Sequence, residues 1–216
     1  MAPSADRLVW IDCEMTGLDP QRDEIVEIAC IVTEADLTEV DAGVSIVVKA
    51  SDAPLAAMDE VVVRMHTESG LLTEIASGTT VLDAERQVLD YVRSHVPEAR
   101  KAPLAGSSVY VDRGFLARHM PELDAHLHYR LIDVSTIKEL ARRWYPRVYF
   151  STPPKVGNHR ALADIRESIA ELRYYREAVL VAPPGPDTAT VQALGRAHVV
   201  DHEAPSPESS APEAAR

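Results

Sequence analysis

Five residues of this sequence have the types and spacing needed for metal-dependent chemistry on a phosphate ester. Asp12 and Glu14 follow a short apolar run, and Asp112 stands where a helix is predicted to begin. Asp164 follows His159 by five residues, near the start of the last predicted helix. Side chains two apart on a strand point to the same face, so Asp12 and Glu14 converge. Convergent carboxylates repel each other and therefore favour a hard divalent cation.

The order D-x-E, then D, then H-x-x-x-x-D fits two-metal phosphoryl transfer. Four carboxylates can hold two Mg²⁺ or Mn²⁺ ions about 4 Å apart, which activate the attacking water and stabilise the leaving oxygen. His159 is the predicted general base, because an imidazole pKa of about 6.5 suits taking a proton near neutral pH. Each piece alone has an ordinary explanation: an exposed turn, a helix cap or a solvated helix face. Their joint arrangement favours a site.

The elements that must position these residues predict an α/β fold, with a sheet layered by helices. Strands are expected at residues 8–11, 24–33, 44–48, 103–106 and 130–133, and helices at residues 61–66, 81–95, 113–119, 135–144 and 160–178. The first three strands suggest a meander. Ser135 and Thr136 are predicted to cap their helix, and residues 145–157, with three prolines, to be irregular. Cys13 should point away from the two carboxylates and only pack.

Length and composition predict one domain of this fold. The chain has 216 residues, 46% of them hydrophobic, which suffices for one sizeable core. We expect a disordered N-terminus over residues 1–6, a folded domain over 7–181, and a disordered acidic tail rich in proline and alanine over 182–216. Six of the fifteen prolines lie after position 182.

The charge and the cysteines narrow the partners and the compartment. A net charge of −12 should repel long polyanions, so a nucleic-acid ligand should be short and held by a few local contacts. Two cysteines make a disulfide framework improbable and favour the reducing cytoplasm. The sequence has neither an apolar signal core at its start nor a run long enough for a membrane span, so we expect no membrane partner.

Three stretches resemble the motifs of a known family: Asp-Cys-Glu-Met-Thr-Gly-Leu at 12–18, Val-Asp-Arg at 111–113 and His-Arg-Ala-Leu-Ala-Asp-Ile at 159–165. They are similar to the three motifs of DEDDh 3′-to-5′ exonucleases and, among these, of the oligoribonucleases, which trim very short RNA to mononucleotides. Residues 65–71 and 131–144 support the resemblance, which covers roughly residues 7–180. It implies a ribonuclease-H-like domain, a mixed sheet flanked by helices. It also implies metal binding by the four carboxylates and a general-base role for His159.

The resemblance also implies substrate contacts. Leu18 would wedge between two bases, and His66 would stack on one of them. Ser108, Arg130 and Ser135 would bind the 5′ phosphate, Arg130 through charge-assisted hydrogen bonds. Such a cap closes the far end of the groove, which would explain a preference for dinucleotides.

The resemblance further implies a homodimer in which Tyr129 reaches into the partner's site, although ordinary packing also explains a tyrosine there. The expected function is the last step of RNA turnover, together with clearance of linear dinucleotides from cyclic dinucleotide signalling. Three alternatives remain open. A general DEDDh exonuclease would cleave long RNA better, an aspartyl-phosphate phosphatase would use Asp12 as nucleophile, and a binding module would capture dinucleotides without cleaving them.

Overall fold

The computed structural model describes residues 6–154 and 159–200, and the chain divides into two units, Met1–Leu180 and Val181–Arg216. The first unit contains a five-stranded sheet in the order β3-β2-β1-β4-β5. β2 is antiparallel to β1 and to β3, whereas β1, β4 and β5 are parallel, so the sheet is mixed. The strands are β1 Leu8–Met15, β2 Ile25–Thr33, β3 Val44–Val47, β4 Pro103–Gly106 and β5 His128–Asp133.

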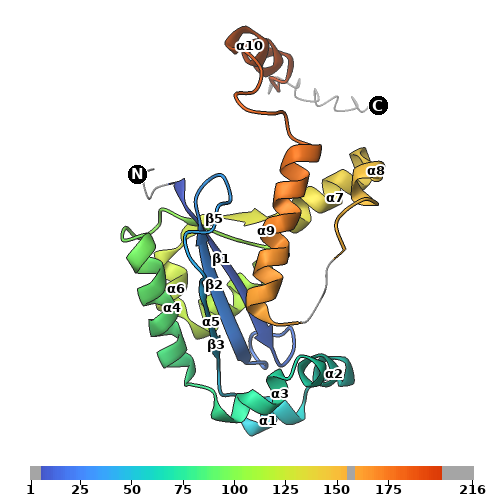
Figure 1. Cartoon of the computed structure of the whole chain (residues 1–216). Helices are drawn as coiled ribbons and strands as arrows, with labels where there is room; N and C mark the ends of the chain where they lie inside the picture. Colours follow the sequence, from blue (N-terminus) through green and yellow to red (C-terminus); the bar gives the residue numbers. More distant parts are fainter. Residues whose placement is uncertain (1–5, 155–158, 201–216) are drawn as a thin grey trace, which may run out of the picture. The chain divides into compact units, whose positions relative to one another are not determined.

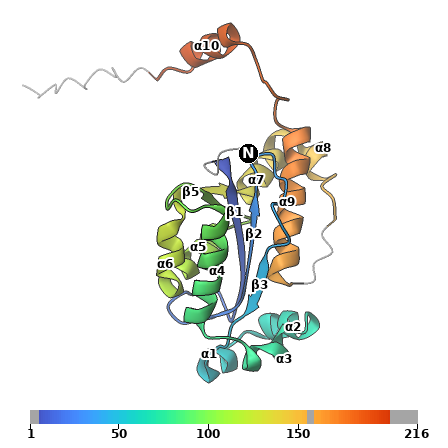
Figure 2. The same cartoon turned by 60° about the vertical axis from the view of Figure 1, so that its left-hand side comes forward.

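Helices cover both faces of this sheet (Figures 1 and 2). α4, α5 and α6 lie on one face and α9 on the other, while α1, α2 and α3 gather at one end of β1, β2 and β3. The helices of this unit are α1 Asp52–Ala56, α2 Glu60–Glu68, α3 Leu71–Glu74, α4 Val81–His95, α5 Tyr110–His119, α6 Pro121–His126, α7 Val134–Trp144, α8 Pro146–Tyr149 and α9 Ala161–Ala178, with a 3₁₀ turn at Ile75–Ser77.

Each face of the sheet has its own apolar core. Val9, Ile11 and Cys13 of β1 join the core beneath α4, α5 and α6. Trp10 packs in the second core with Ile165 and other residues of α9. Burying one large apolar side chain contributes roughly 1.5–3 kcal/mol, so both layers hold the strand firmly. The alternation of β1 therefore directs its even-numbered side chains toward α9, as the sequence predicted for the two carboxylates.

The five strands and the main helices agree with the predicted ranges to within a few residues, and the three-strand meander is confirmed. The largest difference is in β1, which continues past residue 11 to Met15 because β2 pairs with it along its whole length. Asp12 and Glu14 thus lie within the strand and not beyond its exit. α5 begins at Tyr110, which places Asp112 inside its first turn.

Two local predictions were wrong. Asp133, not Ser135 or Thr136, caps α7, since its side chain accepts the Ser135 amide. A short helix, α8, interrupts the segment predicted to be irregular, because Pro146 occupies a first helical position, where proline costs no hydrogen bond.

The described part of the second unit, residues 181–200, contains the helix α10 Thr188–Ala197, capped by the Asp187 side chain. Over residues 188–197 this helix differs from the predicted disorder, and a run of Thr, Val, Gln, Ala and Leu between the prolines is compatible with a helix. Residues 201–216 of the predicted tail lie outside the described residues. The predicted disordered N-terminus lies outside the described residues except for Asp6. Among the described helices, none is both long enough and apolar enough to span a bilayer.

Candidate active site

Three carboxylates converge on the α9 side of the sheet. Asp12 and Glu14 project from β1, and Asp164 projects from the first turn of α9. One ligand atom of each lies within 4.8 Å of the others. The β1–β2 register is irregular between Glu14 and Met15, and such bulges often aim side chains near active sites. The structure therefore brings together three of the four predicted metal ligands.

Asp112, the fourth predicted ligand, lies on α5 beside these three carboxylates and contacts the backbone of β1. It is buried in the first turn of α5, and its Oδ1 accepts a 2.9 Å hydrogen bond from the Cys13 amide, between the two carboxylate positions of β1. Asp112 thus ties α5 to the strand that carries the site. It is near enough to act on the charge of Asp12, although it is outside the 4.8 Å group.

The carboxylates are difficult to ionise together in the metal-free protein. Burial, then the charges of Asp112 and Asp164, raises the pKa of Asp12 well above its ordinary value. Burial and the charges of Asp164 and Glu27 raise the pKa of Glu14 to about 8, against a smaller lowering by Arg160. Burial raises the pKa of Asp112 to about 7, even though the hydrogen bond from Cys13 lowers it. Uncompensated negative charge of this kind favours a cation.

The donor set fits a hard divalent cation. All three converging groups offer carboxylate oxygens, the ligands that Mg²⁺ and Mn²⁺ take, and the raised pKa values of Asp12 and Glu14 show that their ionised forms are poorly stabilised without a cation. The cluster can accordingly hold a metal ion. Asp112 supplies a further carboxylate beside it.

His159 occupies the approach to α9. Its backbone has φ 48°, in the left-handed region that a residue with a side chain rarely adopts. It stands two residues before Ala161, where α9 begins, and Asp164 lies within the first turn of that helix. The general-base role of His159 stays a prediction.

Leu18 has the exposure that a base wedge needs. The residue is 77% exposed in the turn after β1, at the edge of a hollow of about 640 Å³ that Asp23 and Asp59 also line. Asp23 holds this turn by accepting hydrogen bonds from the Thr16 hydroxyl and the Asp19 amide, 3.0 and 2.9 Å long. The turn thus presents Leu18 to solvent on a fixed backbone.

The residues predicted to bind a 5′ phosphate partly converge. The hydroxyls of Ser108 and Ser135 lie 3.1 Å apart, and their amides both donate to Asp133 Oδ1 at 2.9 Å. A shallow hollow of about 460 Å³ is lined by these three residues and by Arg143, which sequence reasoning did not single out. Arg130 is exposed on β5, with its guanidinium carbon 5.5 Å from the centre of the Tyr129 ring.

Strand topology relates this serine pair to the carboxylates. β1, β4 and β5 are parallel, so their carboxyl ends meet at one edge of the sheet. Ser108 follows β4, and Asp133 ends β5 directly before Ser135. In open α/β sheets, ligands bind outside this edge.

His66 differs from the predicted stacking residue. Its side chain is 1% exposed, its Nε2 lies 2.9 Å from the Met15 carbonyl, and its Nδ1 lies 3.9 Å from Glu14 Oε2. Since a carbonyl only accepts, Nε2 carries a proton. The ring therefore offers no open face to a base in this structure. It braces the end of β1 beside Glu14.

Tyr129 is 73% exposed on β5, tilted against the neighbouring His128 ring. An exposed tyrosine of this kind differs from the ordinary packing that was the alternative explanation. Its predicted position across a homodimer interface stays a prediction.

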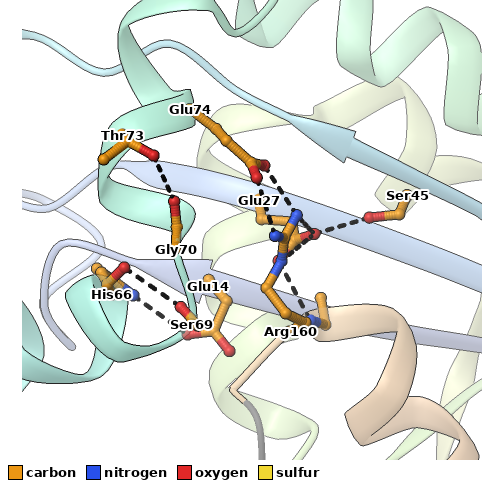
Figure 3. Close-up of polar contacts among 10 residues, drawn as sticks. Glu14, Glu27, Ser45, His66, Ser69, Gly70, Thr73, Glu74 and Arg160 are labelled. Atoms are coloured by element: carbon orange, nitrogen blue, oxygen red, sulfur yellow. Dashed lines mark hydrogen bonds and ion pairs between the residues drawn. The ribbon is translucent and has the colours of Figure 1, made fainter.

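A charged network beside the carboxylates had no signal in the sequence (Figure 3). Arg160 bonds to Glu27 on β2 and to Glu74 on α3. Glu27 also accepts from the Ser45 hydroxyl at 2.7 Å and from the Ala161 amide at 3.2 Å. These partners are as far as 134 residues apart in the chain, so no local pattern could pair them.

The fold and this acidic site define a nuclease of the exonuclease class. The exonuclease family (RNase_T) matches residues 9–172. A solved structure of exonuclease I superposes with a TM-score of 0.63 at 12% identity, covering 80% of this chain and 41% of that longer one. The zinc-bound complex of E. coli exonuclease I with ssDNA gives the same score at 13% identity, covering 81% and 41%. At these identities the two structures support the fold, which is the predicted ribonuclease-H-like mixed sheet.

Relatives of similar sequence identify the family within this class of exonucleases. Oligoribonuclease of Streptomyces avermitilis is 62% identical over 90% of this chain and 98% of its own, and that of Streptomyces griseus is 64% identical over 88% and 94%. Oligoribonuclease of Mycobacterium avium is 56% identical over 95% and 96%. The chain belongs to the oligoribonucleases, the 3′-to-5′ exoribonucleases within this exonuclease family. The predicted family and enzyme class are therefore confirmed.

Proposed function

We propose that this exoribonuclease acts on oligoribonucleotides of a few residues, and on dinucleotides especially, releasing 5′-mononucleotides. The observation that carries the proposal is that a group of three carboxylates and a pair of serine hydroxyls both lie at the carboxyl ends of the parallel strands. The cluster of Asp12, Glu14 and Asp164 supports cleavage there, and the Ser108–Ser135 pair supports capture of a 5′ phosphate. A substrate held at both ends must be short.

In the proposed mechanism four carboxylates would bind the metal ions, and His159 accepts a proton from the attacking water. Asp12, Glu14, Asp112 and Asp164 would hold two divalent cations, Mg²⁺ or Mn²⁺, which neutralise charge developing on the scissile phosphate. His159 takes a proton from the attacking water, whose oxygen bonds to phosphorus. The bond between phosphorus and the 3′ oxygen of the preceding nucleotide breaks. That oxygen takes a proton from solvent, and His159 returns to solvent the proton that it accepted.

Substrate contacts complete the proposal. Leu18 separates the two bases from its exposed turn, which would place the scissile linkage over the carboxylates. The 5′ phosphate is bound by Ser108, Ser135 and Arg130. The positive guanidinium of Arg130 forms charge-assisted hydrogen bonds to it. Since the ring of His66 is buried, stacking on a base would require it to leave the Met15 carbonyl.

The proposal includes an assembly and a cellular role. Exposed Tyr129 supports a homodimer in which this residue completes the partner's site. Two buried free cysteines, Cys13 and Cys30, support a reducing cytoplasmic compartment. There the enzyme would complete RNA turnover and clear linear dinucleotides from cyclic dinucleotide signalling. Full activity of a monomer at nanomolar dilution would remove Tyr129 from the site.

The decisive experiment measures hydrolysis of 5′-phosphorylated oligoribonucleotides of graded length with Mg²⁺, with Mn²⁺ and with a chelator. We expect the dinucleotide to be cleaved fastest, removal of its 5′ phosphate to raise KM, and chelation to stop turnover. Asp112→Ala and His159→Ala should abolish turnover while circular dichroism shows a retained fold.

Three results would contradict the proposal. A rate that rises steadily from dinucleotide to long RNA would indicate a general exonuclease without a closed groove. Near-normal turnover by His159→Ala would remove the proposed base. Tight dinucleotide binding without metal-dependent cleavage would instead indicate a binding module.

A further inference from the structure

Glu27 is a buried carboxylate that the proposed mechanism does not use. It lies on β2 directly opposite Glu14 in the β1–β2 register, and its side chain is 1% exposed. A buried charge is costly unless it is paired and hydrogen-bonded. Glu27 has its principal partner in Arg160, whose Nε and Nη2 lie 3.1 Å from its two oxygens. The pair therefore lies beside the carboxylates of Asp12, Glu14 and Asp164.

Arg160 is also bound on its other side. Its Nη1 and Nη2 lie 3.3 and 3.0 Å from the two oxygens of Glu74 on α3. A planar guanidinium bound by two carboxylates has little freedom to rotate. Figure 3 shows Arg160 held between Glu27 and Glu74, at the start of the helix that carries Asp164. One side chain thus joins β2, α3 and the entry to α9.

The backbone on both sides of this arginine is constrained. His159, immediately before it, has φ 48°, a conformation that persists only when its surroundings enforce it. Ala161, immediately after it, donates its amide to Glu27 at 3.2 Å. The Glu27 carboxylate therefore fixes the side chain of Arg160 and the first amide of α9 together. This arrangement fixes the chain at Arg160 and Ala161, directly after His159.

We propose that Arg160, clamped by Glu27 and Glu74, is a positioning residue that holds the His159 imidazole in the geometry for proton transfer. The inference rests on the general-base role proposed above for His159. Arg160 touches no reacting atom in this scheme. Its effect passes through the backbone, so it should act on the rate of the chemical step and leave dinucleotide binding almost unchanged.

The clamp also connects two parts of the site. Glu74 ends α3, which follows α2, the helix that carries His66 against the end of β1. A displacement of α3 would therefore reach the approach to α9 through Glu74 and Arg160. Through this path a substitution of Glu74, whose side chain is 45% exposed, would affect catalysis.

The first test separates turnover from binding. Arg160→Gln should lower kcat for a 5′-phosphorylated dinucleotide by about 10²-fold, the scale of a misplacement near 1 Å, with KM within about threefold. Arg160→Lys keeps the charge without the planar fork and should restore only part of the rate. Because Arg160→Gln leaves Glu27 buried and unpaired, kcat is normalised to the folded fraction from thermal unfolding.

Glu74→Gln provides a variant that does not threaten folding. It leaves the buried Arg160–Glu27 pair intact and should lower kcat by about three- to tenfold with unchanged KM and Tm. Glu34→Gln is the matched control, because Glu34 is a partly exposed acid paired with Arg7 beyond the opposite end of β2. Glu34→Gln should leave kcat unchanged.

A double-mutant cycle tests whether the effect passes through His159. In a His159→Ala background, Arg160→Gln should cause no further loss of the residual rate, because residues that act as a unit are not additive. An equal loss in both backgrounds would overturn the proposal, and so would a Glu74→Gln enzyme as active as Glu34→Gln. Near-normal turnover by His159→Ala alone would instead overturn the proposed function, whatever the Arg160 variants show.

Discussion

The two faces of β1 carry opposite chemistry on one backbone. Val9, Ile11 and Cys13 point into the apolar core beneath α4, α5 and α6, where burial stabilises the fold. Asp12 and Glu14 point toward α9, where burial raises their pKa values and opposes folding. The same backbone pairing with β2 holds the residues of both faces in place. The strand therefore separates stability from catalysis by side-chain alternation alone.

The acidic face shows what a metal site costs before metal binds. Asp12 and Glu14 on this face, and Asp112 on the neighbouring helix α5, have raised pKa values, with burial as the first cause in each. The apolar face must offset this penalty. Substitutions on the two faces should consequently move different observables, and each prediction below tests that separation.

The largest expected effect is on the acidic face. Asp12→Asn should lower kcat on a dinucleotide by about 10³-fold or more, since a metal ligand supplies charge stabilisation worth several kcal/mol. The same change removes a carboxyl group whose ionisation the fold opposes, so the metal-free protein should become more stable near neutral pH. Turnover with saturating Mn²⁺ and urea unfolding in a chelator measure the two effects. Loss of both activity and stability would show that Asp12 also supports the fold.

The next effect is the pH dependence of metal-free stability. The pKa of Glu14 is about 8 in the folded protein against an ordinary value of 4.5, so the folded state keeps a proton that the unfolded chain releases. The contribution of this proton to the free energy of unfolding is fully present below about pH 4.5 and is lost as pH rises through about 8. The full change for this shift is on the order of 5 kcal/mol.

Chelated protein unfolded by urea at several pH values measures this slope. Glu14→Gln should remove much of this pH dependence. Asp112, with a pKa of about 7, should still cause a loss of stability over an overlapping pH range. Mn²⁺ should flatten the curve, because a bound cation stabilises the ionised carboxylates. A metal-free protein that gains stability from pH 5 to pH 8 would contradict the electrostatic account.

The features of β1 that the sequence predicted correctly are those that depend on local spacing. Alternation on a strand is a local rule, so the convergence of Asp12 and Glu14 and the opposite direction of Cys13 followed from spacing alone. The helical stripe likewise predicted α4 at Val81–His95, with both ends correct. Exposure of Leu18 after the Thr-Gly turn was also accessible, since turns lie at the surface.

The rest of the site depends on tertiary contacts. The Arg160–Glu27 pair joins residues 133 apart, and His66 is buried because the end of β1 packs over it. Asp112 was expected only as a metal ligand, yet it also accepts the Cys13 amide 99 residues away. Pairings of this kind leave no periodic signal, because the partners share neither an element nor a turn.

The smallest expected effect is on the apolar face. Ile11→Val deletes one methylene from a side chain that is 1% exposed, one residue before Asp12. Such changes cost about 0.5–1.5 kcal/mol, and the backbone pairing of Ile11 with Cys30 is retained. Urea unfolding should show this loss while kcat and KM stay within twofold. A tenfold fall in kcat with normal folding would show that packing beneath α4 sets the carboxylate geometry, and the two faces of β1 would then be coupled.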